Sequence, residues 1–203
     1  MVITMANRQK SQNVPFNEGR WNNWIESAKE SDYKNIEEAP PPVFMDMEED
    51  VIIACYKLIR GFEIGRLAKE EMLESLAKIE LITQKKVITG DEDLDDIIDL
   101  VQSSLIGAFA SFECYVTNSF ADDVKADDLI KEAMEQEKKG NLDLALEIVG
   151  KIGAKIMTGN SLSDEAAIEL NDSCVAEWLD GVESISAVLI GNVEYDDGSE
   201  EDE

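Results

Sequence analysis

Apolar residues recur at helical spacing along almost the whole chain, and this periodicity limits the fold more than any other feature of the sequence. The longest such stretch covers residues 92–121, where apolar side chains return every three or four positions and so share one face of a helix. We predict a long central helix here, about 45 Å in length. Its stripe consists of Leu94, Ile97, Ile98, Val101, Leu105, Ala108, Phe109, Phe112, Val116 and Phe120.

This central helix also carries a row of small residues. Ser103, Gly107 and Ser111 lie four positions apart, and no residue between Val101 and Phe112 is charged. Small side chains at this spacing share a face and let a neighbouring helix approach closely. The pattern therefore predicts that the helix is mostly buried.

The same reasoning predicts helices in the rest of the chain, whereas no alternating Val/Ile/Thr run ends in an Asn-Gly or Asp-Gly turn. The predicted fold class is all-α, a single bundle of about seven helices. We expect a flexible polar arm (1–15) before the domain (16–191) and a disordered acidic tail (192–203) after it. The other helices are expected at 18–31, from Asp46 to Phe62, at 69–87, from Asp127 or Asp128 to Lys139, from Asn141 to Gly159, and from Ser163 onward.

Two helix starts have clear local signals. Asn17 is a predicted N-cap, with Phe16 and Trp21 at the spacing of a hydrophobic staple. The three residues 40–42 are prolines and predict an extended spacer before a helix capped by Asp46, with Glu48 in its first turn.

Trp21 and Trp24 lie on one face of the first predicted helix. They either pack this helix onto the bundle or anchor a partner, because tryptophan is common among the residues that dominate interfaces. Both interpretations stay open at this point.

Charge excludes several functions. The chain of 203 residues has 18 basic and 45 acidic residues, no histidine and a net charge of −27. Such a surface repels nucleic acid and anionic membranes, and no stretch approaches the ~20 consecutive apolar residues of a membrane helix. Without histidine, a zinc site or a serine or cysteine nucleophile has little support. We expect no cofactor.

Three widely spaced cysteines indicate a reducing compartment. Cys55, Cys114 and Cys174 form no CxxC pair, and they lie within predicted helices. We expect buried thiols in a reducing, cytoplasmic setting.

Carboxylates alone offer an enzymatic alternative. Glu71 and Glu74 lie three apart on one predicted helix, and Asp96 and Asp99 lie three apart on the next. Such pairs hold Mg²⁺ in all-α nucleotide pyrophosphohydrolases, since this metal prefers oxygen ligands. The competing interpretation is a solvated helix face.

The segment DEDLDDIID (residues 91–99) has the acidic spacing of a calcium loop. It departs from the EF-hand pattern, because Asp96 stands where glycine is needed and Gln102 where a bidentate glutamate is needed. Acids in the first turn of a helix also stabilise it without any metal.

The segment AMEQEKKGNLDLALEIV (residues 133–149) resembles the helical hairpin of tetratricopeptide and microtubule-interacting-and-transport modules. The likeness covers one repeat, whereas a stable array needs about three. We expect an antiparallel hairpin within a larger bundle.

Four stretches together resemble an uncharacterised archaeal family, the domain of unknown function 2150. They are FNEGRWNNWIE (16–26), LVQSSL (100–105), GNLDLAL (140–146) and EWLDGVESISAVL (177–189). The resemblance implies an archaeal, cytosolic, acidic helical domain, without an assigned activity or functional residues to carry over.

The predicted function is a non-enzymatic interaction or regulatory protein. Its expected partner is a protein with a basic face, attracted by charge. The Mg²⁺-dependent hydrolase is the first alternative, and a homodimeric bundle with a structural role is the second.

Overall fold

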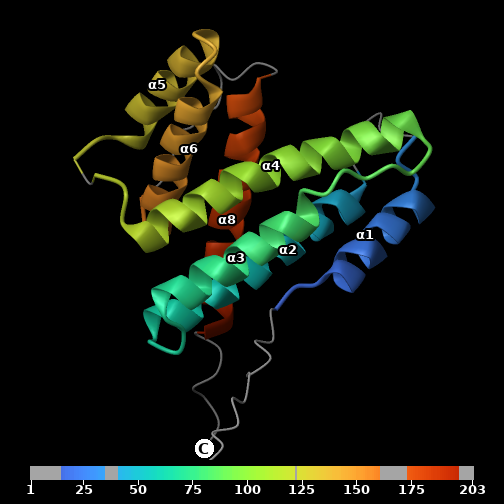
Figure 1. Cartoon of the computed structure of the whole chain (residues 1–203), viewed down its shortest axis with the longest axis horizontal. Helices are drawn as coiled ribbons and strands as arrows, with labels where there is room; N and C mark the ends of the chain where they lie inside the picture. The colour runs from blue at the N-terminus through green and yellow to red at the C-terminus, as the bar shows by residue number, and fades with distance from the viewer. Residues whose placement is uncertain (1–14, 35–40, 122, 161–172, 197–203) are drawn as a thin grey trace, which may run out of the picture.

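The computed structural model describes residues 15–34, 41–121, 123–160 and 173–196, the last five of these by their backbone alone. This part of the chain forms seven α-helices and no strand, which confirms the predicted all-α class (Figure 1). The helices are α1 (Glu18–Glu30), α2 (Pro42–Glu63), α3 (Lys69–Thr83), α4 (Glu92–Thr117), α5 (Ala126–Lys138), α6 (Leu142–Met157) and α8 (Cys174–Asp196).

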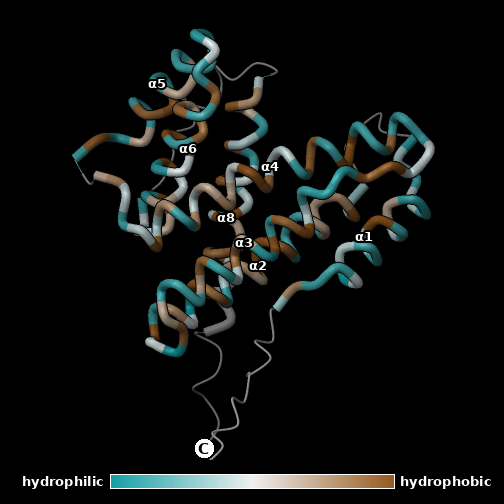
Figure 2. Tube along the Cα trace, in the orientation of Figure 1, coloured by the Kyte–Doolittle hydropathy of each residue, from teal (hydrophilic) through white to brown (hydrophobic). Residues whose placement is uncertain are grey.

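The helices enclose two apolar cores; α4 contributes buried side chains to the first, and Ile106 of α4 packs against the second. The first core is formed by side chains from α1, α2, α3 and α4, and the second by side chains from α5, α6 and the first half of α8. Helix α8 crosses α4 and joins the two cores, because Val182 lies in the second and Ile185 in the first (Figure 1). Along the Cα trace, hydrophobic residues are concentrated where the helices meet, and hydrophilic residues are common at the outer ends of the helices (Figure 2).

Helix α4 is the predicted central helix. It is long and apolar enough to cross a membrane, but 61% of the qualifying window is buried within the fold. The core helix of a soluble protein passes the same test. The expectation that no stretch approaches a membrane helix was therefore too strict, and packing inside the bundle accounts for the composition of α4.

Helix α1 begins as predicted. The side chain of Asn17 accepts a hydrogen bond from the backbone N–H of Arg20 at 3.1 Å. The rings of Phe16 and Trp21 lie 6.4 Å apart, and both side chains are buried. The cap and the staple together fix the angle at which the chain enters the bundle.

Helix α2 begins four residues before the predicted cap at Asp46. Pro41 is extended (φ −53°, ψ 140°), as expected of a spacer, but Pro42 is the first helical residue. Proline fits this position because it needs no intrahelical N–H bond and its φ is already helical. Glu48 consequently lies in the second turn of α2 rather than the first.

Two helices end earlier than predicted. Helix α3 ends at Thr83 instead of residue 87, because the Gln102 side chain reaches from α4 to the backbone carbonyls of Thr83 and Lys85. Helix α4 ends at Thr117, where Asn118 adopts a left-handed conformation (φ 53°). Asparagine tolerates this conformation and so ends the helix before Phe120.

The hairpin of α5 and α6 turns at the predicted glycine. Gly140 has φ 78°, and the N–H groups of Gly140 and Asn141 return to the carbonyls of Glu137 and Gln136 at 2.8 and 2.9 Å. The start at Ala126 lies one residue before the first predicted position. Glycine is favoured at this turn because it has no side chain to oppose a positive φ.

The predicted cap of the last helix, Ser163, lies outside the described residues. Immediately before α8, the Ser173 hydroxyl accepts from the N–H of Ala176 at 3.1 Å. The carboxylate of Glu137 accepts from the N–H of Cys174 at 2.7 Å. A side chain of α5 therefore fixes the position of this end of α8.

Candidate functional site

The two tryptophans of α1 have different environments. Trp21 is buried, with 3% of its surface exposed, and belongs to the first core. Trp24 is half-buried, and its indole N–H donates to the Asp50 carboxylate on α2 at 2.7 Å. Both rings therefore help to hold α1 on the bundle, and neither is presented as an exposed anchor.

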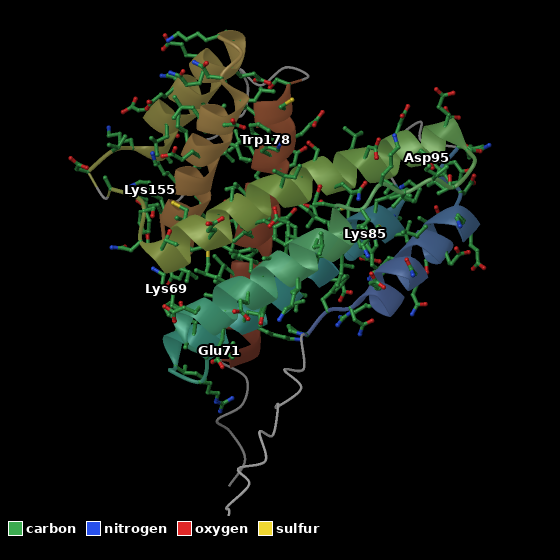
Figure 3. The ribbon with its side chains drawn as sticks, in the orientation of Figure 1. Lys69, Glu71, Lys85, Asp95, Lys155 and Trp178 are labelled. Atoms are coloured by element: carbon green, nitrogen blue, oxygen red, sulfur yellow. The ribbon has the colours of Figure 1, made fainter. Side chains whose placement is uncertain are left out.

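The structure does not bring together the carboxylate pairs of the proposed magnesium site. Glu71 and Glu74 lie in the first half of α3, Asp96 and Asp99 lie near the start of α4, and all four are exposed. The chain reverses between these helices, so Glu71 and the start of α4 at Asp95 lie at opposite ends of the bundle (Figure 3). Among the described residues, no three acidic or thiol side chains gather closely enough to hold a metal ion.

The acidic run at the start of α4 stabilises this end of the helix. The Asp95 carboxylate accepts from the backbone N–H and the hydroxyl of Thr89 at 2.8 and 2.6 Å. These hydrogen bonds lower the pKa of Asp95. Asp91 pairs with Lys34 at 2.6 Å, and this contact lowers the pKa of Asp91.

The cysteines have no disulfide partner. Cys55 and Cys114 are buried as predicted, whereas Cys174 is half-buried at the start of α8. Burial raises the pKa of all three thiols, and that of Cys114 reaches about 11. They remain protonated at neutral pH and are poor nucleophiles.

The crossing of α4 and α8 is unusually close, because glycine lies on both helices. A Cβ atom added to Gly107 on α4 would lie 2.1 Å from the backbone oxygen of Trp178 on α8. One added to Gly181 on α8 would lie 2.1 Å from the backbone oxygen of Ser104 on α4. The small residues predicted to allow a close neighbour do so, and Figure 3 places Trp178 at this crossing.

Carboxylates gather beside this crossing. Glu48 comes from α2, and Glu177, Asp180 and Glu183 come from three successive turns of α8; we call these four residues the carboxylate junction. The charges of the other three members all act on Asp180.

Serine hydroxyls hold two members of the junction in place. The Ser104 hydroxyl of α4 donates to Glu48 at 2.6 Å, and the Ser184 hydroxyl of α8 also bonds this carboxylate. The Ser103 hydroxyl donates to Glu177. Since the serines belong to the closely packed crossing, the spacing of the carboxylates depends on the packing of α4 against α8.

Ionisation is unfavourable at two positions of the junction. Partial burial, together with the charges of Glu183, Glu48 and Glu177, raises the pKa of Asp180 to about 6. Burial also raises the pKa of Glu48, although its bonds from Ser104 and Ser184 oppose this shift. An ordinary aspartate has a pKa near 3.9, so Asp180 is charged at pH 7 against strong local opposition.

No cation compensates this charge within the described residues. Burial and the neighbouring carboxylates all raise the pKa of Asp180, and no cation lowers it. The pKa of Glu48 is lowered only by the hydroxyls of Ser104 and Ser184, which carry no charge. Seven ion pairs of the described chain lie elsewhere: Arg20–Asp50, Lys29–Glu26, Lys34–Asp91, Arg60–Glu63, Lys85–Glu18, Lys139–Glu135 and Lys151–Glu147. The junction is therefore a concentration of negative charge without an internal counterion.

The structure thus defines an all-helical, strongly acidic protein whose distinctive surface feature is an uncompensated carboxylate cluster at a helix crossing. A family model described as an uncharacterised protein conserved in archaea, DUF2150, matches residues 16–198. The chain belongs to this family, as the four resembling stretches predicted. No curated protein and no solved structure matches the chain.

Proposed function

We propose that this protein is a cytoplasmic, non-enzymatic interaction module that binds a basic protein partner at its carboxylate junction. The observation that carries the proposal is the gathering of Glu48, Glu177 and Glu183 around Asp180 at the helix crossing, where no cation of the described chain acts on Asp180. A lysine or arginine placed at Asp180 gains attraction from all four carboxylates at once. Binding also relieves repulsion that is present in the unbound protein.

The surroundings of the junction support this role. The side chains of Asp180 and Glu183 are open to solvent on one side, although the α2 and α8 neighbours partly bury the Asp180 carboxyl, so a partner reaches both without unfolding the helices. The hydroxyls of Ser103 and Ser104 hold Glu177 and Glu48 in position before binding, which reduces the entropy lost on association. The net charge of −27 adds long-range attraction for a basic partner.

A capture experiment on host lysate tests the proposal. The bait is the full chain in three forms: unchanged, Glu177→Gln with Asp180→Asn, and Glu70→Gln with Glu74→Gln. The last pair removes the same charge from exposed positions on α3. We expect a basic protein to be retained by the unchanged chain and the α3 variant. Retention should fall about tenfold for the junction variant and also on raising salt from about 50 to about 500 mM.

Two outcomes contradict the proposal. Equal loss from both variants assigns the attraction to overall charge rather than to the junction. Retention that is indifferent to both substitutions and to salt removes charge as the cause of binding.

A further inference from the structure

Two exposed apolar side chains flank the carboxylate junction. Met45 on α2 has 68% of its surface exposed, and Leu100 on α4 has 54%. Met45 lies three positions before Glu48 and therefore shares its helix face, as Leu100 does with Ser104, four positions later. The Ser104 hydroxyl donates to Glu48 at 2.6 Å. Each apolar side chain is therefore one helical turn from the same hydrogen bond.

Met45 and Leu100 lie on the same side of this hydrogen bond, because α2 and α4 run in the same direction. Near the other end of both helices, the Tyr115 hydroxyl of α4 donates to Glu63 of α2 at 2.7 Å. From the first contact to the second, the residue numbers increase along both helices. Both apolar residues precede the first contact, so they lie at the same end of the contact between α2 and α4.

Helix α8 leaves Leu100 uncovered. Leu100 lies seven positions before Gly107, two turns earlier on the same face of α4, and the Trp178 backbone of α8 covers this face at Gly107. Because α8 crosses α4 there rather than following it, Leu100 stays exposed at the edge of the crossing (Figure 1). Ser103, one turn after Leu100, donates to Glu177 of α8. The apolar pair therefore adjoins the junction on the α8 side as well.

The α8 carboxylates form a row with helical spacing. Glu177, Asp180 and Glu183 follow one another at intervals of three residues, so the row is about 9 Å long. Basic residues at positions i, i+4 and i+7 of a partner helix cover about 10 Å, whereas three residues on one face of a strand cover about 13 Å. The row therefore fits basic side chains from a helix better than those from an extended segment.

We infer that the carboxylate junction binds an amphipathic helix of a partner protein, whose basic face meets α8 and whose apolar edge covers Met45 and Leu100. Charge complementarity argues for this partner, since no cation of the described chain acts on Asp180. The apolar edge is required because a wholly polar segment would leave both apolar side chains in water, and helices bind through such edges. This inference rests on the proposed function and adds the conformation of the partner to it.

Two fluorescently labelled peptides test the inference by anisotropy titration with the full chain. Both are alanine-rich helices of about 18 residues with the same numbers of lysines and leucines. The amphipathic peptide has its lysines on one face and its leucines along the adjacent edge, whereas the control has both distributed around the helix. We expect the amphipathic peptide to bind with a dissociation constant on the order of 10⁻⁵ M at about 50 mM salt, and the control at least about fivefold more weakly.

A matched pair of variants assigns the apolar contacts. Met45→Gln with Leu100→Gln should weaken binding of the amphipathic peptide about fivefold, because two apolar contacts are lost. Ile64→Gln with Leu81→Gln should leave binding unchanged. These control residues have 53% and 68% of their surface exposed and lie at the end of α2 and on α3.

The inference is overturned if neither peptide binds the unchanged chain, if both peptides bind equally, or if Met45→Gln with Leu100→Gln weakens binding no more than its control. The carboxylate variant Glu177→Gln with Asp180→Asn separates this failure from that of the proposed function. Equal binding of both peptides that this variant abolishes overturns the helical partner and leaves recognition by charge in place. Amphipathic binding that this variant does not weaken contradicts the proposed function and the inference together.

Discussion

Gly107→Ala lowers the free energy of unfolding by about 3 kcal/mol or more, because one methyl group forces α4 and α8 apart. The added Cβ would lie 2.1, 2.7 and 2.8 Å from the O, C and Cα atoms of Trp178. All three belong to the backbone of α8, so no change of rotamer relieves the overlap. The better helix propensity of alanine, worth about 1 kcal/mol, does not offset this cost.

Urea unfolding followed by circular dichroism at 222 nm measures the effect. The control is Gly191→Ala on α8, where an added Cβ has no atom within 4 Å. The control should be neutral or more stable by up to about 1 kcal/mol. A Gly107→Ala protein as stable as the control would show that the two helices do not cross at this distance.

Gly153→Ala destabilises the chain by about 2 to 3 kcal/mol, and Ser111→Gly restores most of the loss. The added Cβ on α6 would lie 1.9 Å from the hydroxyl oxygen of Ser111 and 2.3 Å from its Cβ atom. Here the obstacle is a side chain on α4, so deleting it makes room. The next neighbour, a methyl group of Val182, lies 3.3 Å away and needs only a small shift.

A double-mutant cycle of urea midpoints measures this compensation. Ser111→Gly alone should cost about 1 kcal/mol, since it puts a second glycine into a helix and removes the hydroxyl bond to the Gly107 carbonyl. The double variant should be more stable than Gly153→Ala alone. Additive losses in the cycle would contradict direct contact between these two positions.

Local sequence signals predicted the fold well. The stripe of α4 as far as Val116, the row of Ser103, Gly107 and Ser111, and the turn at Gly140 were found where the pattern indicated. Each depends on neighbours along the chain or on one face of one helix. The errors arose where the end of a helix depends on a residue far away in the sequence. The Gln102 side chain on α4, for example, donates to the carbonyls of Thr83 and Lys85, and α3 therefore ends early.

The candidate site could not be predicted in the same way. With 45 acidic residues in the chain, many pairs have a suggestive spacing, and Glu71 with Glu74 was one of them. The carboxylate junction joins Glu48 to residues some 130 positions later, which only the crossing of the helices brings together. Buried Lys155 was missed for a similar reason, since its amine donates to the Ala121 carbonyl beyond the end of α4, at 3.0 Å.

The raised pKa of Asp180 also links the junction to stability. The folded chain binds this proton more tightly than the unfolded chain, whose aspartates titrate near pH 3.9. The free energy of unfolding therefore falls as the pH rises from about 4 to about 6, and the loss is complete above that range. Binding of a basic partner would recover part of this loss at neutral pH.

The most direct test of the account is the pKa of Asp180 itself, from an NMR titration of its side-chain ¹³C carboxyl signal. We expect a value of about 6 in the unchanged chain. We also expect a lower value in Glu183→Gln, which removes the strongest neighbouring charge. A value near 4 that does not respond to this substitution would contradict repulsion among the carboxylates of the junction. It would also remove the reason for expecting a basic partner there.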